Sequence, residues 1–191
     1  MVVVSSSGIS GAVKRSGPAQ SSQPQIIKPR QKIQRDASTK LNIIIVGAGL
    51  GGVGAAIGLL LGGHDVTILE SAPQIAEVGA GIQVLPNASR LLQEWGMKEA
   101  LDRYSTAPSH VNMLGWKGNT ITRMSTEDSA KLYPGTAYWD FHRANLHKCL
   151  VERAEELGAK LVVNSKVANV VAKEEGAQCF LKTVQSGKRI S

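Results

Sequence analysis

Three glycines and one acidic residue have the spacing of a site for a diphosphate-linked dinucleotide. Gly47, Gly49 and Gly52 form a Gly-x-Gly-x-x-Gly pattern. Gly47 would permit a tight turn, Gly49 would let the backbone approach a pyrophosphate, and Gly52 would let a helix pack closely on a strand. Glu70 follows about 20 residues later, where a carboxylate accepts hydrogen bonds from a ribose and disfavours a 2′-phosphate.

The segments around these residues predict the elements that would position them. Residues 41–46, LNIIIV, are a continuous β-branched run, which is typical of a strand covered on both faces. Residues 52–63 predict a helix of small residues that ends at a glycine pair, and residues 64–70 predict a second strand. Strand, glycine turn, helix and strand make a βαβ unit, the context in which the glycine pattern indicates dinucleotide binding. The helix N-terminus would offer its amide groups to the phosphates.

A membrane helix is the main alternative for this stretch. Residues 41–63 carry no charge, and about 20 apolar residues suffice to cross a bilayer. Four glycines within residues 47–52 would weaken such a helix, and a membrane span would leave Glu70 without a role. We therefore expect no stable membrane span, and a glycine-rich turn with a purely structural role stays a second alternative.

The composition separates a basic N-terminal segment from a nearly neutral body. The chain has 191 residues, 42% of them hydrophobic, and a net charge of +7. Most of that charge falls in residues 1–39, which are rich in Ser, Gln and Pro and are expected to be disordered. Because the body is nearly neutral, nucleic acid is not an expected partner. We expect a cytoplasmic location, or an organelle if the basic segment is a transit peptide.

No metal or redox site is expected from the cysteines and histidines. Cys149 and Cys179 are far apart and match no ligand or redox spacing. His142 and His147 are five residues apart and would not share one face of a helix. The expected metal set is therefore none.

The remainder of the chain predicts a mixed α/β domain over residues 40–185, with a short tail at 186–191. Residues 71–86 are expected to be a loop, and Asn87 is expected to cap a helix that stops at Gly96. Three tryptophans, Trp95, Trp116 and Trp139, are expected to be core anchors, and an approach to a substrate cavity is the alternative for Trp139. The other predicted elements are a hairpin over 110–124, an amphipathic helix over 142–158, and strands over 160–174 and 177–184.

Two longer stretches carry a family resemblance. Residues 70–96, ESAPQIAEVGAGIQVLPNASRLLQEWG, and residues 138–171, beginning YWDFHRANLH, resemble the class A flavoprotein monooxygenases of the p-hydroxybenzoate and salicylate hydroxylase group. With the glycine pattern, three motifs occur in the expected order over about residues 41–172. The resemblance implies an α/β, Rossmann-like FAD-binding domain with a mostly parallel sheet. It also implies that the three glycines hold the FAD pyrophosphate and that Glu70 binds the adenosine ribose.

The same resemblance implies five further cofactor contacts. Gly79, Gly81 and Gln83 would pass near the ribityl chain and flavin ring. Arg143 would contact FAD from a helix start, and Val167 would offer a backbone contact on the adenine side. Roles without a cofactor stay open as alternatives to these contacts. Arg143 could be an ordinary ion-pair partner, and the glycine loop could be flexible only.

The family reaction would be hydroxylation of a small aromatic substrate with O2 and NAD(P)H. The family's later Asp-Gly and Gly-Asp signatures do not occur in this chain, and family members are longer. We therefore expect a domain that is incomplete relative to the family, whether as a fragment, a truncated gene model or a pseudo-enzyme, and we name no catalytic residue. A non-catalytic FAD- or NAD-binding module is the alternative function. An NAD-dependent dehydrogenase domain is a third, against which the GAGIQ and HRANLH motifs argue.

Overall fold

The computed structural model describes residues 2–3, 38–75, 79–173 and 176–182. These residues divide into two compact units. Among the described residues, the first unit holds 2–3, 38–75 and the chain from 154 onward, and the second unit holds 79–153. Each unit is described by itself.

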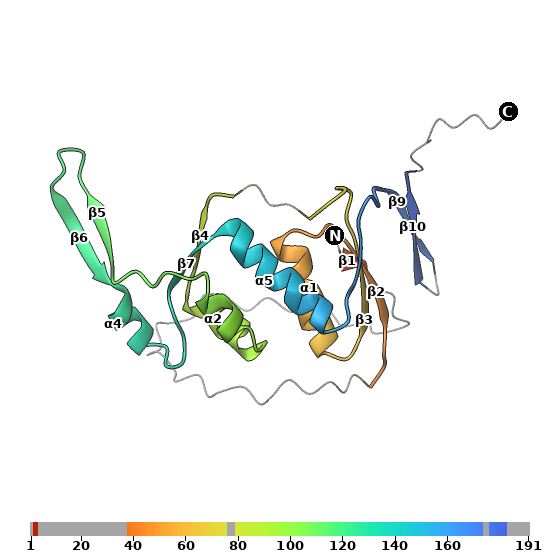
Figure 1. The fold of residues 1–191 in the computed structure, drawn as a ribbon, viewed down its shortest axis with the longest axis horizontal. Helices are drawn as coiled ribbons and strands as arrows, with labels where there is room; N and C mark the ends of the chain where they lie inside the picture. Colours follow the sequence, from red (N-terminus) through yellow and green to blue (C-terminus); the bar gives the residue numbers. More distant parts are fainter. Residues whose placement is uncertain (1, 4–37, 76–78, 174–175, 183–191) are drawn as a thin grey trace, which may run out of the picture. The chain divides into compact units, whose positions relative to one another are not determined.

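The first unit contains a four-stranded sheet in the order β1-β2-β3-β8. Figure 1 labels three of these strands, β1, β2 and β3. The strand β2 (Asn42–Val46) lies parallel to β3 (Asp65–Leu69), and β3 lies parallel to β8 (Lys160–Val162). The helix α1 (Leu50–Leu61) joins β2 to β3, and β1 (Val2–Val3) pairs antiparallel with the other edge of β2. The predicted βαβ unit and its mostly parallel sheet are therefore confirmed.

Burial of apolar side chains explains why α1 covers this sheet. Ile43 and Ile45 of β2 are almost fully buried. On α1, Val53, Ala56, Ile57 and Leu60 are buried, at the spacing of one helical face. The helix stops at Gly62, as predicted. No helix among the described residues is long and apolar enough to span a membrane.

Strand β1 departs from the expectation of disorder over residues 1–39. Val2 and Val3 pair with Ile45 and Ile44, because two β-branched residues suit the otherwise open edge of β2. Residues 4–37 and the predicted tail at 186–191 lie outside the described residues, so the rest of that expectation stays a prediction.

Strands form in both segments where the C-terminal part predicted them, but the first segment contains two strands instead of one. Residues 160–174 do not form a single strand, because Asn164 has a positive φ of 54° and separates β8 from β9 (Val167–Lys173). Strand β9 pairs antiparallel with β10 (Gly176–Leu181) in a two-stranded sheet of its own.

The second unit contains a short antiparallel ribbon that the sequence analysis did not foresee. Strand β4 (Gly81–Val84) pairs with β7 (Trp139–His142). The prediction of a loop over residues 71–86 is therefore wrong for Gly81–Val84. The strand is short and its partner lies far along the chain, so the local pattern of β4 alone does not reveal it.

Three helices accompany the ribbon, namely α2 (Pro86–Glu94), α3 (Lys98–Asp102) and α5 (Arg143–Glu156). The prediction of Asn87 as the cap of α2 is wrong. Leu85 occupies that position and Pro86 begins the helix, because a proline lacks the N–H that the first turn cannot pair. Gly96 has a positive φ of 76° after the helix, as expected of a stop.

The long predicted helix is confirmed as α5. Its stripe residues Leu146, Leu150 and Ala154 are buried, and Gly158 has a positive φ of 98° just beyond its end. The amphipathic pattern alone therefore located this helix to within a residue or two.

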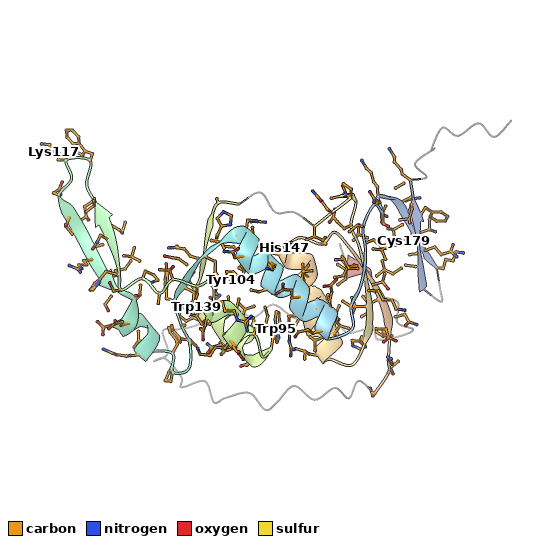
Figure 2. All side chains as sticks on the ribbon, in the orientation of Figure 1. Trp95, Tyr104, Lys117, Trp139, His147 and Cys179 are labelled. Atoms are coloured by element: carbon orange, nitrogen blue, oxygen red, sulfur yellow. The ribbon has the colours of Figure 1, made fainter. Side chains whose placement is uncertain are left out.

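The predicted hairpin forms from β5 (His110–Leu114) and β6 (Thr120–Ser125), and the unpredicted helix α4 (Thr126–Lys131) follows it. Trp139 is buried, as predicted, but Trp116 is 92% exposed at the hairpin end. Its neighbour Lys117, labelled in Figure 2, holds its ammonium 5.0 Å from the Trp116 ring centroid. The prediction of Trp116 as a core anchor is wrong, because the turn of a hairpin lies beyond any covering element.

Candidate cofactor site

The glycine turn leaves β2 in a conformation that suits glycine. Gly47 has a φ of 98°, a region that side-chain-bearing residues rarely adopt. Its N–H donates to the carbonyl oxygen of Leu69 at 2.8 Å, which ties the turn to the end of β3. The turn thus lies at the carboxyl ends of two parallel strands, where open α/β sheets bind ligands.

Gly52 and Gly49 serve different purposes. A Cβ at Gly52 would overlap the carbonyl oxygen of Gly47, so this glycine allows α1 to approach the turn, as predicted. A Cβ at Gly49 would meet no heavy atom within 4 Å. Packing within the protein therefore does not explain Gly49, and its contact with a pyrophosphate stays a prediction.

Helix α1 begins without a cap from a side chain. Its N-cap residue is Gly49, and its first turn contains no acidic residue. The first amides of a helix have no acceptor within that helix, and the helix dipole places positive potential there. The N-terminus of α1 can therefore receive an anion such as a diphosphate.

Glu70 places its carboxylate against the same turn. Its Oε2 accepts a hydrogen bond from the Ala48 N–H at 2.8 Å. Its Oε1 accepts one from the Ala72 N–H at 2.8 Å and one from the Ser71 hydroxyl at 3.0 Å. The spacing in the sequence predicts that Glu70 and the glycine turn meet, and the structure brings them together.

The donors around Glu70 favour its ionised form. The Ala48 N–H, followed by the Ala72 N–H, lowers the pKa of the Glu70 carboxyl from its ordinary value. The Ser71 N–H lowers this pKa as well. A ribose hydroxyl that binds here would join these donors or replace one of them.

Val167 also lies in the first unit, at the start of β9, where it pairs with Leu181. Its contact with the adenine side stays a prediction, because its position at the strand start does not by itself indicate a ligand.

The other four predicted residues gather at one end of the β4–β7 ribbon in the second unit. Gly81 pairs with His142, and Gln83 lies two residues further along β4. Arg143 follows directly at the start of α5, where its N–H donates to the Ala80 carbonyl at 3.0 Å. The structure therefore places Gly79, Gly81, Gln83 and Arg143 near one another, and their cofactor contacts stay predictions.

Gly79 has a packing reason of its own. A Cβ on it would come within 2.5 Å of Cε1 of His142. The imidazole therefore lies directly against this glycine, which the sequence pattern did not predict.

Known proteins that resemble this chain share this arrangement of elements. A family model described as "FAD binding domain" matches residues 40–191. The chain belongs to this FAD-binding domain family. The resemblance to aromatic flavoprotein monooxygenases and the prediction of FAD as cofactor are therefore confirmed.

Two curated relatives illustrate the family. The FAD-dependent monooxygenase OpS4 of Beauveria bassiana (strain ARSEF 2860) is 33% identical over 132 residues, which cover 68% of this chain and 31% of OpS4. The 3-hydroxybenzoate 6-hydroxylase of Polaromonas naphthalenivorans (strain CJ2) is 33% identical over 143 residues, which cover 74% of this chain and 36% of that enzyme. This FAD-binding domain chain thus matches about a third of the length of these relatives.

A solved structure agrees with the fold. The crystal structure of CtdE in complex with FAD and substrate 4 matches with a TM-score of 0.65 and 25% identity. The match covers 74% of this chain and 34% of CtdE.

The first unit of this FAD-binding domain fits the cofactor. The open space at Gly49 and the uncapped start of α1 suit a diphosphate. The anchored carboxylate of Glu70 suits a ribose hydroxyl. In the part of the chain that the structure describes, no cluster of three or more His, Cys, Asp or Glu residues could hold a metal ion.

Sequence reasoning missed one donor at the Glu70 carboxylate and one pairing on the β4–β7 ribbon. The Ala48 N–H orients Glu70, and a backbone donor leaves no mark in residue types. Asp140 lies opposite Gln83 on β7. The sequence signal for the position of Asp140 is the alternation in WDFH. This alternation places Asp140 and His142 on the face opposite Trp139 and Phe141.

Proposed function

We propose that this chain supplies the FAD-binding part of a flavin-dependent monooxygenase that hydroxylates a small aromatic, salicylate-like substrate with O2 and NAD(P)H. The names of the relatives support the reaction class, since they include a 3-hydroxybenzoate 6-hydroxylase and a 6-hydroxynicotinate 3-monooxygenase. The choice of a salicylate-like acid, O2 and NAD(P)H comes from the family resemblance.

One observation carries the proposal, namely the hydrogen bond from the Ala48 N–H to the Glu70 carboxylate beside an uncapped helix start. The bond fixes an acceptor for a ribose next to donors for a diphosphate. Bound FAD would supply the redox chemistry. The residues of this chain would bind and orient it through the first turn of α1 and through Glu70.

A non-catalytic binding module is not favoured. The relatives named above are monooxygenases or hydroxylases. The geometry at Glu70 suits a cofactor that takes part in catalysis as well as one that is only bound.

The test has two stages. The purified chain is mixed with FAD, passed through a desalting column and scanned for flavin absorption, which we expect to remain with the protein. NADH or NADPH oxidation is then followed with and without 3-hydroxybenzoate or salicylate, and stimulation by the aromatic acid is expected. Retained FAD without any aromatic-dependent oxidation would support the binding module instead. Loss of all FAD on the column would refute the proposal that this chain binds FAD.

A further inference from the structure

The parallel pairing between β3 and β8 becomes irregular at Glu70. Leu69 pairs with Val162, and the Glu70 N–H continues the ladder by donating to the Val162 carbonyl at 2.8 Å. In a regular parallel ladder, the next bond would join the Asn164 N–H to the Glu70 carbonyl. The Ser165 N–H makes that bond instead, at 2.7 Å. The chain after β8 therefore carries an extra residue opposite Glu70.

The extra residue is Asn164, and its backbone conformation is unusual. Among the residues that the structure describes, Asn164 is the only one other than glycine with a positive φ, 54°. Asparagine adopts this left-handed region more readily than most residues. Extra residues of this kind bend a strand and occur often beside functional sites, where they aim side chains. Asn164 is exposed, so burial of its side chain does not explain the conformation.

The left-handed turn directs the Asn164 N–H to a residue that orients Glu70. This N–H donates to the Ala72 carbonyl at 2.9 Å. The N–H of the same Ala72 donates to Oε1 of Glu70 at 2.8 Å. Asn164 thus fixes the residue that holds the carboxylate, while the bond from Ser165 fixes the main chain of Glu70.

The position of Ala72 affects the direction of the carboxylate. Oε2 of Glu70 is held by the Ala48 N–H, which belongs to the glycine turn after β2. Backbone donors from two different segments therefore orient the two oxygens. A shift of Ala72 would turn the carboxylate about its bond to Ala48 and move its acceptor positions relative to the start of α1. Binding geometry of this kind depends on the residues that support the contacting group.

We propose that Asn164 is a positioning residue for the ribose site, because its left-handed backbone holds residues 70–72 where Glu70 can meet the ribose of bound FAD. This inference rests on the FAD binding in the proposed function and adds a residue outside the βαβ unit. All the residues involved belong to the first unit. Asn164 does not contact the cofactor and acts through Ala72 and Glu70.

Two nucleotides isolate the ribose contact. ADP carries the diphosphate and the adenosine ribose hydroxyls, whereas 2′,3′-dideoxy-ADP carries the same diphosphate without those hydroxyls. Their affinities for the full chain are measured by isothermal titration calorimetry. The unsubstituted chain should prefer ADP by about tenfold or more, the size of a hydrogen bond to a charged group. Glu70→Ala should abolish this preference.

Two substitutions of Asn164 separate the backbone from the side chain. Asn164→Val introduces a β-branched residue that disfavours the left-handed region. The turn must then rearrange, and we expect the preference for ADP to fall to about threefold or less. Asn164→Gly keeps the left-handed conformation accessible, so it should retain the full preference. The affinity for dideoxy-ADP should be the same in both variants as in the unsubstituted chain.

Asn42→Val is the matched control for the substitution by valine. Asn42 is exposed at the start of β2 in the same unit, and valine suits a strand. This variant should leave the affinities for both nucleotides unchanged.

Three results in the Asn164 variants would overturn the assignment. A full preference for ADP in Asn164→Val, while Glu70→Ala loses it, would refute the role of Asn164 alone. An equal loss of affinity for both nucleotides in Asn164→Val would make Asn164 a structural residue. The same loss of preference in Asn164→Gly as in Asn164→Val would assign the effect to the amide side chain.

The unsubstituted chain tests the two levels of the proposal separately. If it binds FAD but binds ADP and dideoxy-ADP equally well, the ribose contact of Glu70 is refuted, and the role of Asn164 with it. If it binds neither FAD nor ADP, the proposed function itself is refuted.

Discussion

The glycine turn of the first unit and the β5–β6 hairpin of the second both follow a clear sequence pattern. They differ in how far other parts of their unit contact and cover them. In the turn, three of the four notable residues have a partner that explains them: Gly47 donates to Leu69, Gly52 lies against Gly47, and Glu70 accepts from Ala48. The hairpin forms from an equally clear alternation, yet Met113, Leu114 and Trp116 are 52%, 59% and 92% exposed. A pattern therefore predicts an element more reliably than it predicts what covers that element.

The largest effect is expected from adding one methyl group inside the turn. Gly52→Ala places a Cβ against the Gly47 carbonyl oxygen, so the helix or the turn must shift. We expect a loss of about 3 kcal/mol in the free energy of unfolding, measured by urea denaturation. Gly54→Ala is the control, because a Cβ there meets nothing within 4 Å and should stabilise the helix by up to about 1 kcal/mol. Equal effects of the two substitutions would contradict the close approach.

A smaller, pH-dependent effect is expected at the carboxylate. Glu70→Gln removes an ionised acceptor of two backbone donors and should lower the free energy of unfolding by about 1 kcal/mol, allowing for partial exposure. The pKa of Glu70 is lowered in the folded protein. Its contribution is therefore complete above the ordinary value of 4.5 and disappears as the pH falls through the lowered pKa.

Denaturation of both proteins at about pH 7 and about pH 3 checks this sign, and the difference between them should shrink at the acid end. A gap that stays constant or widens toward acid would show that the charge of Glu70 does not contribute to stability.

The smallest effect is expected on the hairpin. Trp116→Ser should change the free energy of unfolding by less than about 0.5 kcal/mol, since the side chain is 92% exposed and buries almost nothing. A loss several times larger would mean that Trp116 is covered, and the contrast between the two regions would fail.

The elements that sequence reasoning predicted well are those whose determinants are local. The turn at Gly47 and the carboxylate at Glu70 depend on residue types within one βαβ unit, and the structure places them together. The β4–β7 ribbon was missed because its strands are short and far apart in the chain. Asp140 pairs with Thr106 and Gln83 from segments far apart in the chain, so no local pattern displays these pairings.

The cap of α2 was mispredicted for a related reason. Asn87 is a good capping residue by type, but Pro86 before it fixes the backbone conformation of the first helical turn. The steric restriction that Pro86 places on the backbone therefore outweighed the capping preference of Asn87.

The most direct test of the central claim compares the affinity of FAD with that of riboflavin, in the unsubstituted chain and in Gly49→Val. The claim is that the amides at the start of α1 receive the diphosphate, which riboflavin lacks. The unsubstituted chain should bind FAD much more tightly than riboflavin, and Gly49→Val should abolish that preference, because its side chain fills the open space beside the turn. A preference for FAD that survives in Gly49→Val would contradict the claim.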